Sequence, residues 1–178
     1  MKQISECGRS MIEVIGVLAI IGVISVALAK TIMSVYDKYK ISRVTQQITE
    51  LKKNISNRYV ANGDYSIIDI SEMLTENIVP ADMKNSGTVE HSFGGAVTIF
   101  GDTDTYSVTF PRLTQQACVE LALMNWVFSG DSDLFRLKIN DTEFNWPIVN
   151  SAGAQLPVTA SDAMTACSDN ATITWTFR

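Results

Sequence analysis

The sequence predicts an α+β protein in which one long N-terminal helix packs on an antiparallel β-sheet. Two observations predict this class. Residues 11–29 are all apolar or small apart from Glu13, and helical periodicity continues well beyond them. Later in the chain, residues 105–110 and 172–177 alternate between apolar and polar side chains, as strands with one covered face do. The long helix is the natural cover for that face.

The apolar run is long enough to serve as a membrane helix. At about 1.5 Å per residue it approaches the roughly 30 Å thickness of a bilayer core. It starts behind a short polar stretch, residues 1–8, and no small-residue cleavage site follows its C-terminal end. We therefore expect the segment to be retained rather than removed as an ordinary secretory signal.

Beyond the run the chain keeps a helical stripe. Five apolar side chains recur at spacings of three and four residues: Ile41, Val44, Ile48, Leu51 and Ile55. No proline occurs before Pro80. We therefore predict one helix from about residue 12 to about residue 59, ended by residues 62–64 with Gly63 as a left-handed cap.

The remaining elements are shorter. We predict a loop over residues 65–83 with a helical part at 68–74, and a hairpin of strands 97–100 and 105–110. A helix over 113–128 follows, then short strands at 134–139 and 143–146. A loop at 150–160, a turn or short helix at 161–166 and the strand 172–177 complete the prediction.

Glu13 is the informative residue of the apolar run, because a carboxylate inside a membrane helix is costly. One interpretation places it at the membrane interface, where its charge favours the helix N-terminus. The other gives it a cationic partner within the membrane. The sequence offers such a partner if the chain is cut after Gly8, since the new α-amine of Arg9 would lie about one helical turn from Glu13.

Gly8, Glu13 five residues later and the unbroken apolar run resemble the class III signal of type IV prepilins. The resemblance implies that a prepilin peptidase cuts after Gly8 and methylates the new N-terminus at Arg9. It implies that Glu13 is the assembly residue, which pairs with the N-terminal amine of a subunit already in the filament. Arg9 departs from the apolar residue usual in that family. Residues 77–83 and 93–99 resemble the type IVb branch, closest to major pilins of the plasmid thin-pilus and bundle-forming kind.

The resemblance also specifies the fold and the cysteines. It implies the pilin α/β roll, with a disulfide that joins the C-terminal region to the head. Cys7 lies in the leader, which leaves Cys118 and Cys167 as the pair. Their bridge would close about 50 residues and contribute roughly 4 kcal/mol in the chain-entropy model. Two unrelated buried thiols are the alternative. Gly22 is a candidate helix hinge by the same resemblance, although the proline that often follows is missing.

The charge is unevenly distributed over the 178 residues, whose net charge is -5. Residues 1–58 hold nine Lys or Arg and four Asp or Glu, whereas residues 59–178 hold five and fifteen. The acidic head argues against direct nucleic-acid binding, and we expect none, because neutralising phosphates requires Lys and Arg.

The predicted organisation has four parts. Residues 1–8 form the leader, 9–30 the transmembrane and filament-core helix, 31–60 its amphipathic continuation and 61–178 the globular head. Basic residues flank both ends of the apolar run, so the positive-inside rule alone does not fix the orientation. The prepilin resemblance and the cysteine pair favour a cytoplasmic N-terminus and a head outside the inner membrane.

No catalytic or metal-binding constellation is recognisable, and we expect no enzyme activity, cofactor or metal. The single histidine, His91, is flanked by Ser and Gly residues and is expected to be a solvated loop side chain. Two Asp-x-Asp stretches, at 102–104 and 131–133, do not extend to a full calcium-binding loop, and turn formation explains them better.

We therefore expect the major structural subunit of a type IV pilus for adhesion, aggregation or conjugative mating contact. Its expected partners are other copies of itself, the prepilin peptidase, the pilus assembly machinery and, before assembly, the inner membrane. A minor pilin or a type II secretion pseudopilin is the alternative within the family. A single-span, membrane-anchored binding module that never polymerises is the alternative from another class.

Overall fold

The computed structural model describes residues 11–61, 63–124, 126, 134–146 and 154–178. The chain divides into two compact units, with the boundary between Tyr39 and Lys40. Helix α1 (Met11–Tyr59) contributes to both units, and it ends at the predicted residue. After α1, Gly63 has a φ of 64°, in the left-handed region, as predicted for the cap.

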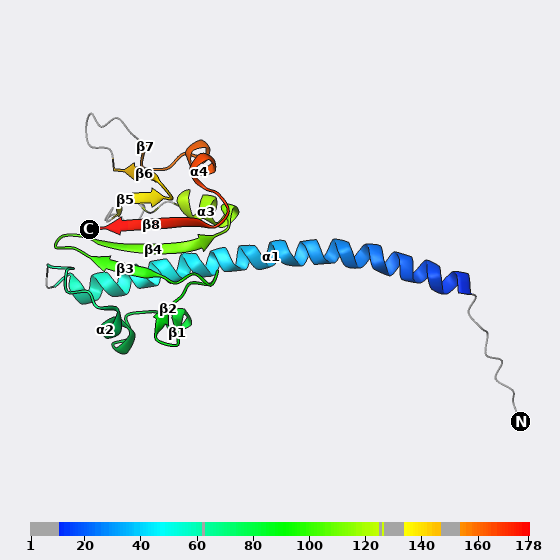
Figure 1. Ribbon diagram of the computed structural model, residues 1–178, viewed down its shortest axis with the longest axis horizontal. Coiled ribbons are helices and arrows are strands. Elements are labelled where there is room, and N and C mark those ends of the chain that lie inside the picture. Colours follow the sequence, from blue (N-terminus) through cyan, green and yellow to red (C-terminus); the bar gives the residue numbers. More distant parts are fainter. Residues whose placement is uncertain (1–10, 62, 125, 127–133, 147–153) are drawn as a thin grey trace, which may run out of the picture. The chain divides into compact units, whose positions relative to one another are not determined.

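The second unit is built on a six-stranded sheet of order β3-β4-β8-β5-β6-β7 (Figure 1). Neighbouring strands are antiparallel except for β6 and β7, whose short parallel pairing was not predicted. The final strand lies in the middle of the sheet, between β4 and β5. The strands are β3 (Thr98–Gly101), β4 (Tyr106–Leu113), β5 (Leu134–Ile139), β6 (Thr142–Asn145), β7 (Ala154–Gln155) and β8 (Ala171–Phe177).

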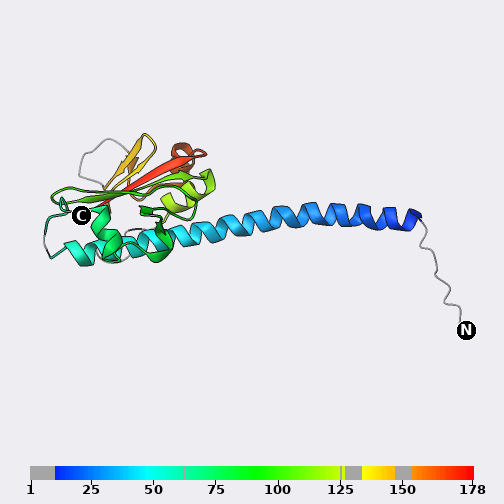
Figure 2. The ribbon, with the colours of Figure 1, turned by 60° about the horizontal axis from the view of Figure 1, so that its bottom comes forward.

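The core lies between one face of this sheet and the α1 residues of the second unit (Figure 2). The whole predicted helical stripe is buried, and so are the apolar residues of the alternating pattern in β8, Ile173, Trp175 and Phe177. Trp175 is the largest of them and contacts the ring of Phe110 edge-on at 5.4 Å. The apolar side chains of α1 and those of the sheet pack against each other in one buried layer. Burial of this layer provides the main stabilisation of the unit.

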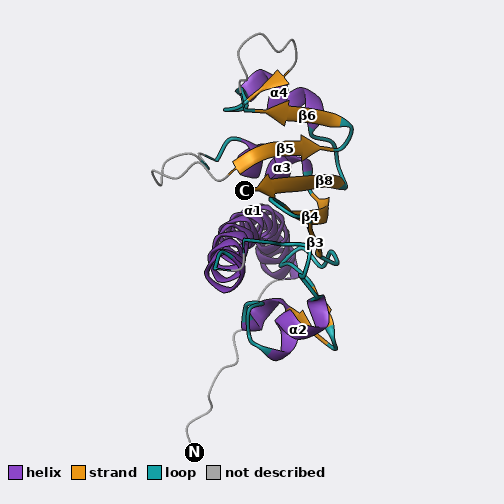
Figure 3. Ribbon diagram, turned by 90° about the vertical axis from the view of Figure 1, so that its left-hand side faces the viewer, coloured by secondary structure: helices purple, strands orange, loops and turns teal. Residues whose placement is uncertain are grey.

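The segment between α1 and β3 lies beside the second-unit part of α1, which Figure 3 shows nearly end-on. It contains α2 (Ile70–Thr75), the 3-10 turn η1 (Ala81–Met83) and a two-stranded ribbon, β1 (Lys84–Asn85) with β2 (Thr88–Val89). Helix α2 starts two residues later than predicted because the Asp69 carboxylate accepts the Ser71 N–H and fixes the N-cap. The β1–β2 ribbon was not predicted.

The predicted helix over 113–128 is wrong at both ends. Leu113 belongs to β4 and pairs with Ala171, while Thr114 caps α3 (Gln115–Ala122) by accepting the Ala117 N–H. After α3, the Trp126 indole N–H donates to the carbonyl of Leu121, which satisfies a helix-end acceptor without another helical turn. Residues 127 and 128 lie outside the described part. Helix α4 (Ala160–Ala166) agrees with the predicted turn or short helix.

Gly101 provides a test of the packing between β3 and the loop after α1. A Cβ at Gly101 would collide with the backbone carbonyl of Tyr65. We expect Gly101→Ala to lower the free energy of unfolding by about 1–3 kcal/mol, the usual cost of overpacking. Urea unfolding in detergent measures it. Gly16→Ala is the matched control, because a Cβ there meets no heavy atom within 4 Å. Equal midpoints for the two variants would contradict the prediction.

Candidate functional site

The first unit presents an apolar helix surface that nothing in the described chain covers. From Met11 to Tyr39, almost every described side chain is exposed, including Met11 at 85% and Val23 at 73%. Among the described residues, α1 is the one helix long and apolar enough to cross a membrane. In water such a surface costs about 25 cal/mol per Å² left uncovered. The arrangement therefore requires an apolar environment supplied from outside the chain.

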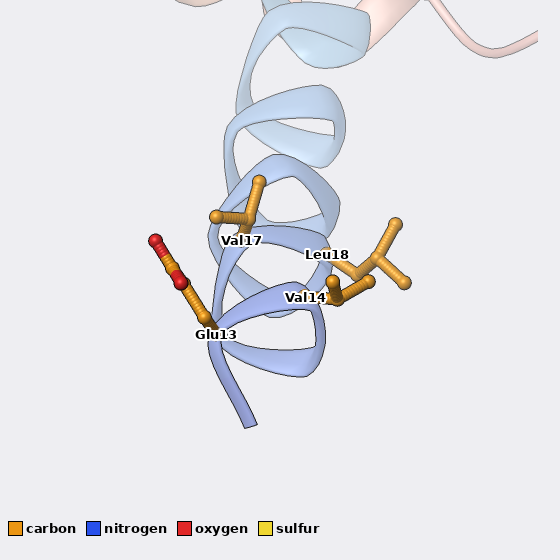
Figure 4. A pocket seen from close by; sticks show the side chains of 4 residues that line it. All are labelled: Glu13, Val14, Val17 and Leu18. Carbon is orange, nitrogen blue, oxygen red and sulfur yellow. The ribbon is translucent and has the colours of Figure 1, made fainter. Parts of the chain in front are cut away.

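Glu13 interrupts this surface in the first turn of α1. It lines a shallow pocket with Val14, Val17 and Leu18 (Figure 4). Glu13 and Val17 are four residues apart and share one side of the helix, while Val14 and Leu18 share the adjacent side. Within residues 11–61 the Glu13 carboxylate makes no ion pair. A carboxylate surrounded by apolar side chains favours a cation as its ligand once water is excluded.

Of the other residues predicted for this site, the structure describes Gly22 but not Gly8 or Arg9. Gly8 and Arg9, like Cys7, lie outside the described residues. Gly22 lies within the helix, and a Cβ there would meet nothing within 4 Å. No packing inside the described chain therefore requires glycine at position 22. Its role as a hinge remains a prediction.

A second apolar stripe on the same unit was missed by the sequence prediction. It comprises Ile32, Val35, Tyr36 and Tyr39, which are exposed and line a shallow groove with Thr31. Their spacing of three and four residues places them on one side of the helix. The signal was present in the sequence, but the apolar run before it and the buried stripe after it obscured it.

In the second unit, the disulfide joins Cys118 of α3 to Cys167, the residue that caps α4. Both cysteines are buried. The Gln115 side chain donates to the carbonyl of Cys167 at 3.2 Å and adds a second link between the same two elements. The predicted disulfide-bonded C-terminal region is therefore confirmed, and the bridge links the helix before β5 to the helix before β8.

The prediction for His91 is wrong, because the side chain is buried, with 3% exposed, rather than solvated. Its ring stacks on Phe110 with centroids 4.9 Å apart, and Nε2 lies 2.6 Å from the carbonyl oxygen of Pro111. Burial lowers the pKa of His91 below its ordinary value. Both contacts lie on β4, about twenty residues away in the chain, so local sequence could not reveal them.

Buried Gln47 of α1, with 2% exposed, was also missed. Its amide donates to the Asp82 carboxylate at 3.0 Å and accepts the Ser92 N–H at 3.1 Å. Arg43, one turn earlier on α1, forms an ion pair with the same Asp82 at 3.2 Å. This network fixes the segment before β3 against α1. No group of three or more potential metal ligands occurs among the described residues.

A family model described as PilS N terminal matches residues 38–178. Among solved structures, TcpA, a type IV pilin from Vibrio cholerae El Tor biotype, is 13% identical with a TM-score of 0.53, covering 79% of this chain and 99% of that one. The type IV b pilin from Salmonella typhi is 17% identical with a TM-score of 0.47, covering 71% and 96%. No curated protein sequence matches the chain significantly.

Proposed function

Because the chain belongs to the PilS family of type IV pilins and has the α+β pilin fold, we propose that it is the major subunit of a type IV pilus. The family is one of structural pilus subunits rather than of enzymes. We propose that this subunit forms most of the filament. We also propose that the filament serves adhesion, aggregation or conjugative mating contact.

The observation that carries this proposal is the uncovered apolar surface of α1 from Met11 to Tyr39. Two environments can cover this apolar surface, a lipid bilayer and a bundle of identical helices. We propose that the chain uses both in sequence. Residues 9–30 span the inner membrane once, with the N-terminus in the cytoplasm, and then form the filament core. Residues 31–60 continue the helix, and residues 61–178 form the head outside the membrane.

The proposed processing step supplies the missing cation for Glu13. The prepilin peptidase removes residues 1–8 after Gly8 and methylates the amine of Arg9. In the filament, Glu13 of one subunit pairs with that amine on a neighbour, so each charge neutralises the other inside an apolar bundle. An unpaired charge there would cost several kcal/mol. The pairing therefore selects the axial register between subunits as well as stabilising them.

Polymerisation follows from the kind of interface. The Glu13 carboxylate and the N-terminal amine are different surfaces of the subunit, so their contact is heterologous and does not close on itself. Repetition of such a contact builds a helical filament. Growth requires the pilus assembly machinery to move each subunit out of the inner membrane, where its apolar helix is otherwise stable.

The intact mass and N-terminal sequence of the protein in a sheared cell-surface fraction test the proposal. We expect an abundant chain that starts at methylated Arg9. A correctly cut chain that is scarce in this fraction would overturn the major role in favour of a minor pilin or a secretion pseudopilin. A chain that keeps Met1 and stays in the membrane would instead indicate an anchored module that does not polymerise.

A further inference from the structure

The turn between β2 and β3 is closed around His91, the only histidine in the chain. Glu90 and Ala96 form an isolated antiparallel bridge, and the Gly94 N–H donates to the His91 carbonyl at 2.7 Å. This places the imidazole inside the unit, where it stacks on Phe110 at an interplanar angle of 10°. Gly95 allows the approach, because a Cβ there would collide with the imidazole and with the Pro111 carbonyl.

The contacts of the ring define its protonation. Nε2 lies 2.6 Å from the Pro111 carbonyl oxygen, which can only accept, so Nε2 carries the hydrogen. Nδ1 lies 3.2 Å from the backbone nitrogen of Phe93, whose N–H donates to it. In a neutral imidazole the second nitrogen is such an acceptor. Both nitrogens are thus used, and the geometry fits the neutral ring alone.

The same turn connects two structural elements. On one side the Ser92 N–H donates to Gln47 of α1, and Lys40 of α1 lies 5.4 Å from the centre of the Phe93 ring. On the other side His91 donates to Pro111, and Arg112 donates to the Gly94 carbonyl at 3.4 Å. Residues 91–95 therefore join α1 to β4 through contacts that depend on the orientation of the turn.

We propose that His91 is an acid-sensitive latch for this turn. A proton taken up at Nδ1 replaces the acceptor lone pair by an N–H that points at the Phe93 N–H. The hydrogen bond is lost, the two donors repel each other, and the charged ring favours water over the face of Phe110 and the surrounding core. The turn opens, and its contacts with Gln47 and Lys40 on α1 are released together.

The charges around the latch set the conditions for opening. Glu90, the residue before His91, carries a negative charge that favours the protonated form of the imidazole. Arg112 from β4 and Lys40 from α1 are cations at the two sides of the turn and disfavour a third positive charge. Asp82 is engaged with Arg43 and Gln47.

The direction of the pH effect follows from the buried neutral ring. Desolvation is the main reason that the pKa of His91 lies below its ordinary value of 6.5 in the closed turn. The open form has the ordinary pKa. The stabilisation of the closed turn is therefore fully present above pH 6.5 and declines as the pH falls toward the lowered pKa. In that window each unit by which the pH falls increases the open fraction by at most about tenfold, because opening allows one proton to bind.

Two measurements on the full chain in detergent micelles test the latch between pH 7.5 and pH 5.0. The first is NMR of the histidine-labelled chain, which contains one histidine signal. The second is hydrogen exchange of the Phe93 amide, corrected for the intrinsic pH dependence. We expect the ring to titrate below pH 6.5 and Phe93 protection to fall as the ring is protonated, by at most about tenfold per pH unit. Ordinary titration at 6.5 with unchanged Phe93 protection would overturn the proposal.

His91→Asn is the matched variant, because its side-chain oxygen can accept the Phe93 N–H and does not titrate in this range. We expect its Phe93 protection to be independent of pH. An equal pH dependence in the variant would overturn the latch. If the variant does not fold, the wild-type titration still decides. Protection of Leu121 and Ala163 near the disulfide is the internal reference, and a parallel loss there would indicate general acid unfolding instead of a latch.

Discussion

Glu13→Ala is expected to abolish filaments while leaving the protein cut after Gly8 and inserted in the membrane. The substitution removes the only charge from residues 11–29, so membrane insertion becomes easier rather than harder. In the proposed filament it leaves the N-terminal amine of the neighbour unpaired among apolar helices. An uncompensated charge in such surroundings costs about 3 kcal/mol, which corresponds to a loss of about 100-fold in subunit association.

The measurement is the amount of subunit in the sheared fraction relative to the membrane fraction, together with electron microscopy of the cells. Glu50→Ala is the matched control, since it removes an exposed acid from the same helix within the second unit. We expect the control to assemble normally. Abundant normal pili from Glu13→Ala would exclude the assembly role of Glu13, and an uncut precursor would assign Glu13 to processing instead.

Loss of the disulfide is expected to have the largest effect on the second unit. In Cys118→Ala/Cys167→Ala the bridge no longer restricts a loop with a sequence separation of 49 residues in the unfolded chain. The chain-entropy model gives a loss of about 4 kcal/mol. That is a large part of the roughly 5–15 kcal/mol typical of a whole domain. Alanine is chosen over serine because both cysteines are buried, and a buried serine hydroxyl would need a new hydrogen-bond partner.

Thermal unfolding followed by near-ultraviolet circular dichroism measures the change, with the protein held in the same detergent throughout. Cys7→Ala is the control, because Cys7 belongs to the proposed leader and takes no part in the bridge. We expect the double variant to melt well below the control. Equal melting temperatures, or no change after reduction of the wild type, would show that packing of α3 and α4 alone holds this region.

Elements with strong local periodicity could be predicted from the sequence. The apolar stripe from Ile41 to Ile55 and the alternating pattern that ends at Phe177 each indicate an element with one covered face. The apolar side chains of both patterns are buried as predicted. The left-handed conformation of Gly63 was also predictable, since the position after a helix often adopts this conformation and then favours glycine. For the candidate site, the apolar run and the carboxylate of Glu13 within it are local features of the sequence, and they were sufficient to predict the exposed part of α1.

The features that could not be predicted depend on contacts between distant residues. His91 is buried because β4 supplies its ring partner Phe110, and Gln47 is buried because Asp82 and Ser92 meet it from another segment. The end of α3 was misplaced for a related reason. Apolar residues after Ala122 continue a helical pattern, but the Trp126 indole takes the carbonyl that another turn would use.

Strand β8, the last strand to be synthesised, lies between β4 and β5 in the sheet. Among the described strands, β4 pairs with β3 and β8, and β5 pairs with β6 and β8. In this part of the chain, β8 is the strand that links the β3–β4 hairpin to the β5–β6 hairpin. Until residues 171–177 emerge, the sheet consists of two separate halves with exposed strand edges. In the proposed topology, in which the head is exported from an N-terminal anchor, the sheet is therefore completed in one late step, and the edges of the two half-sheets are exposed before that step.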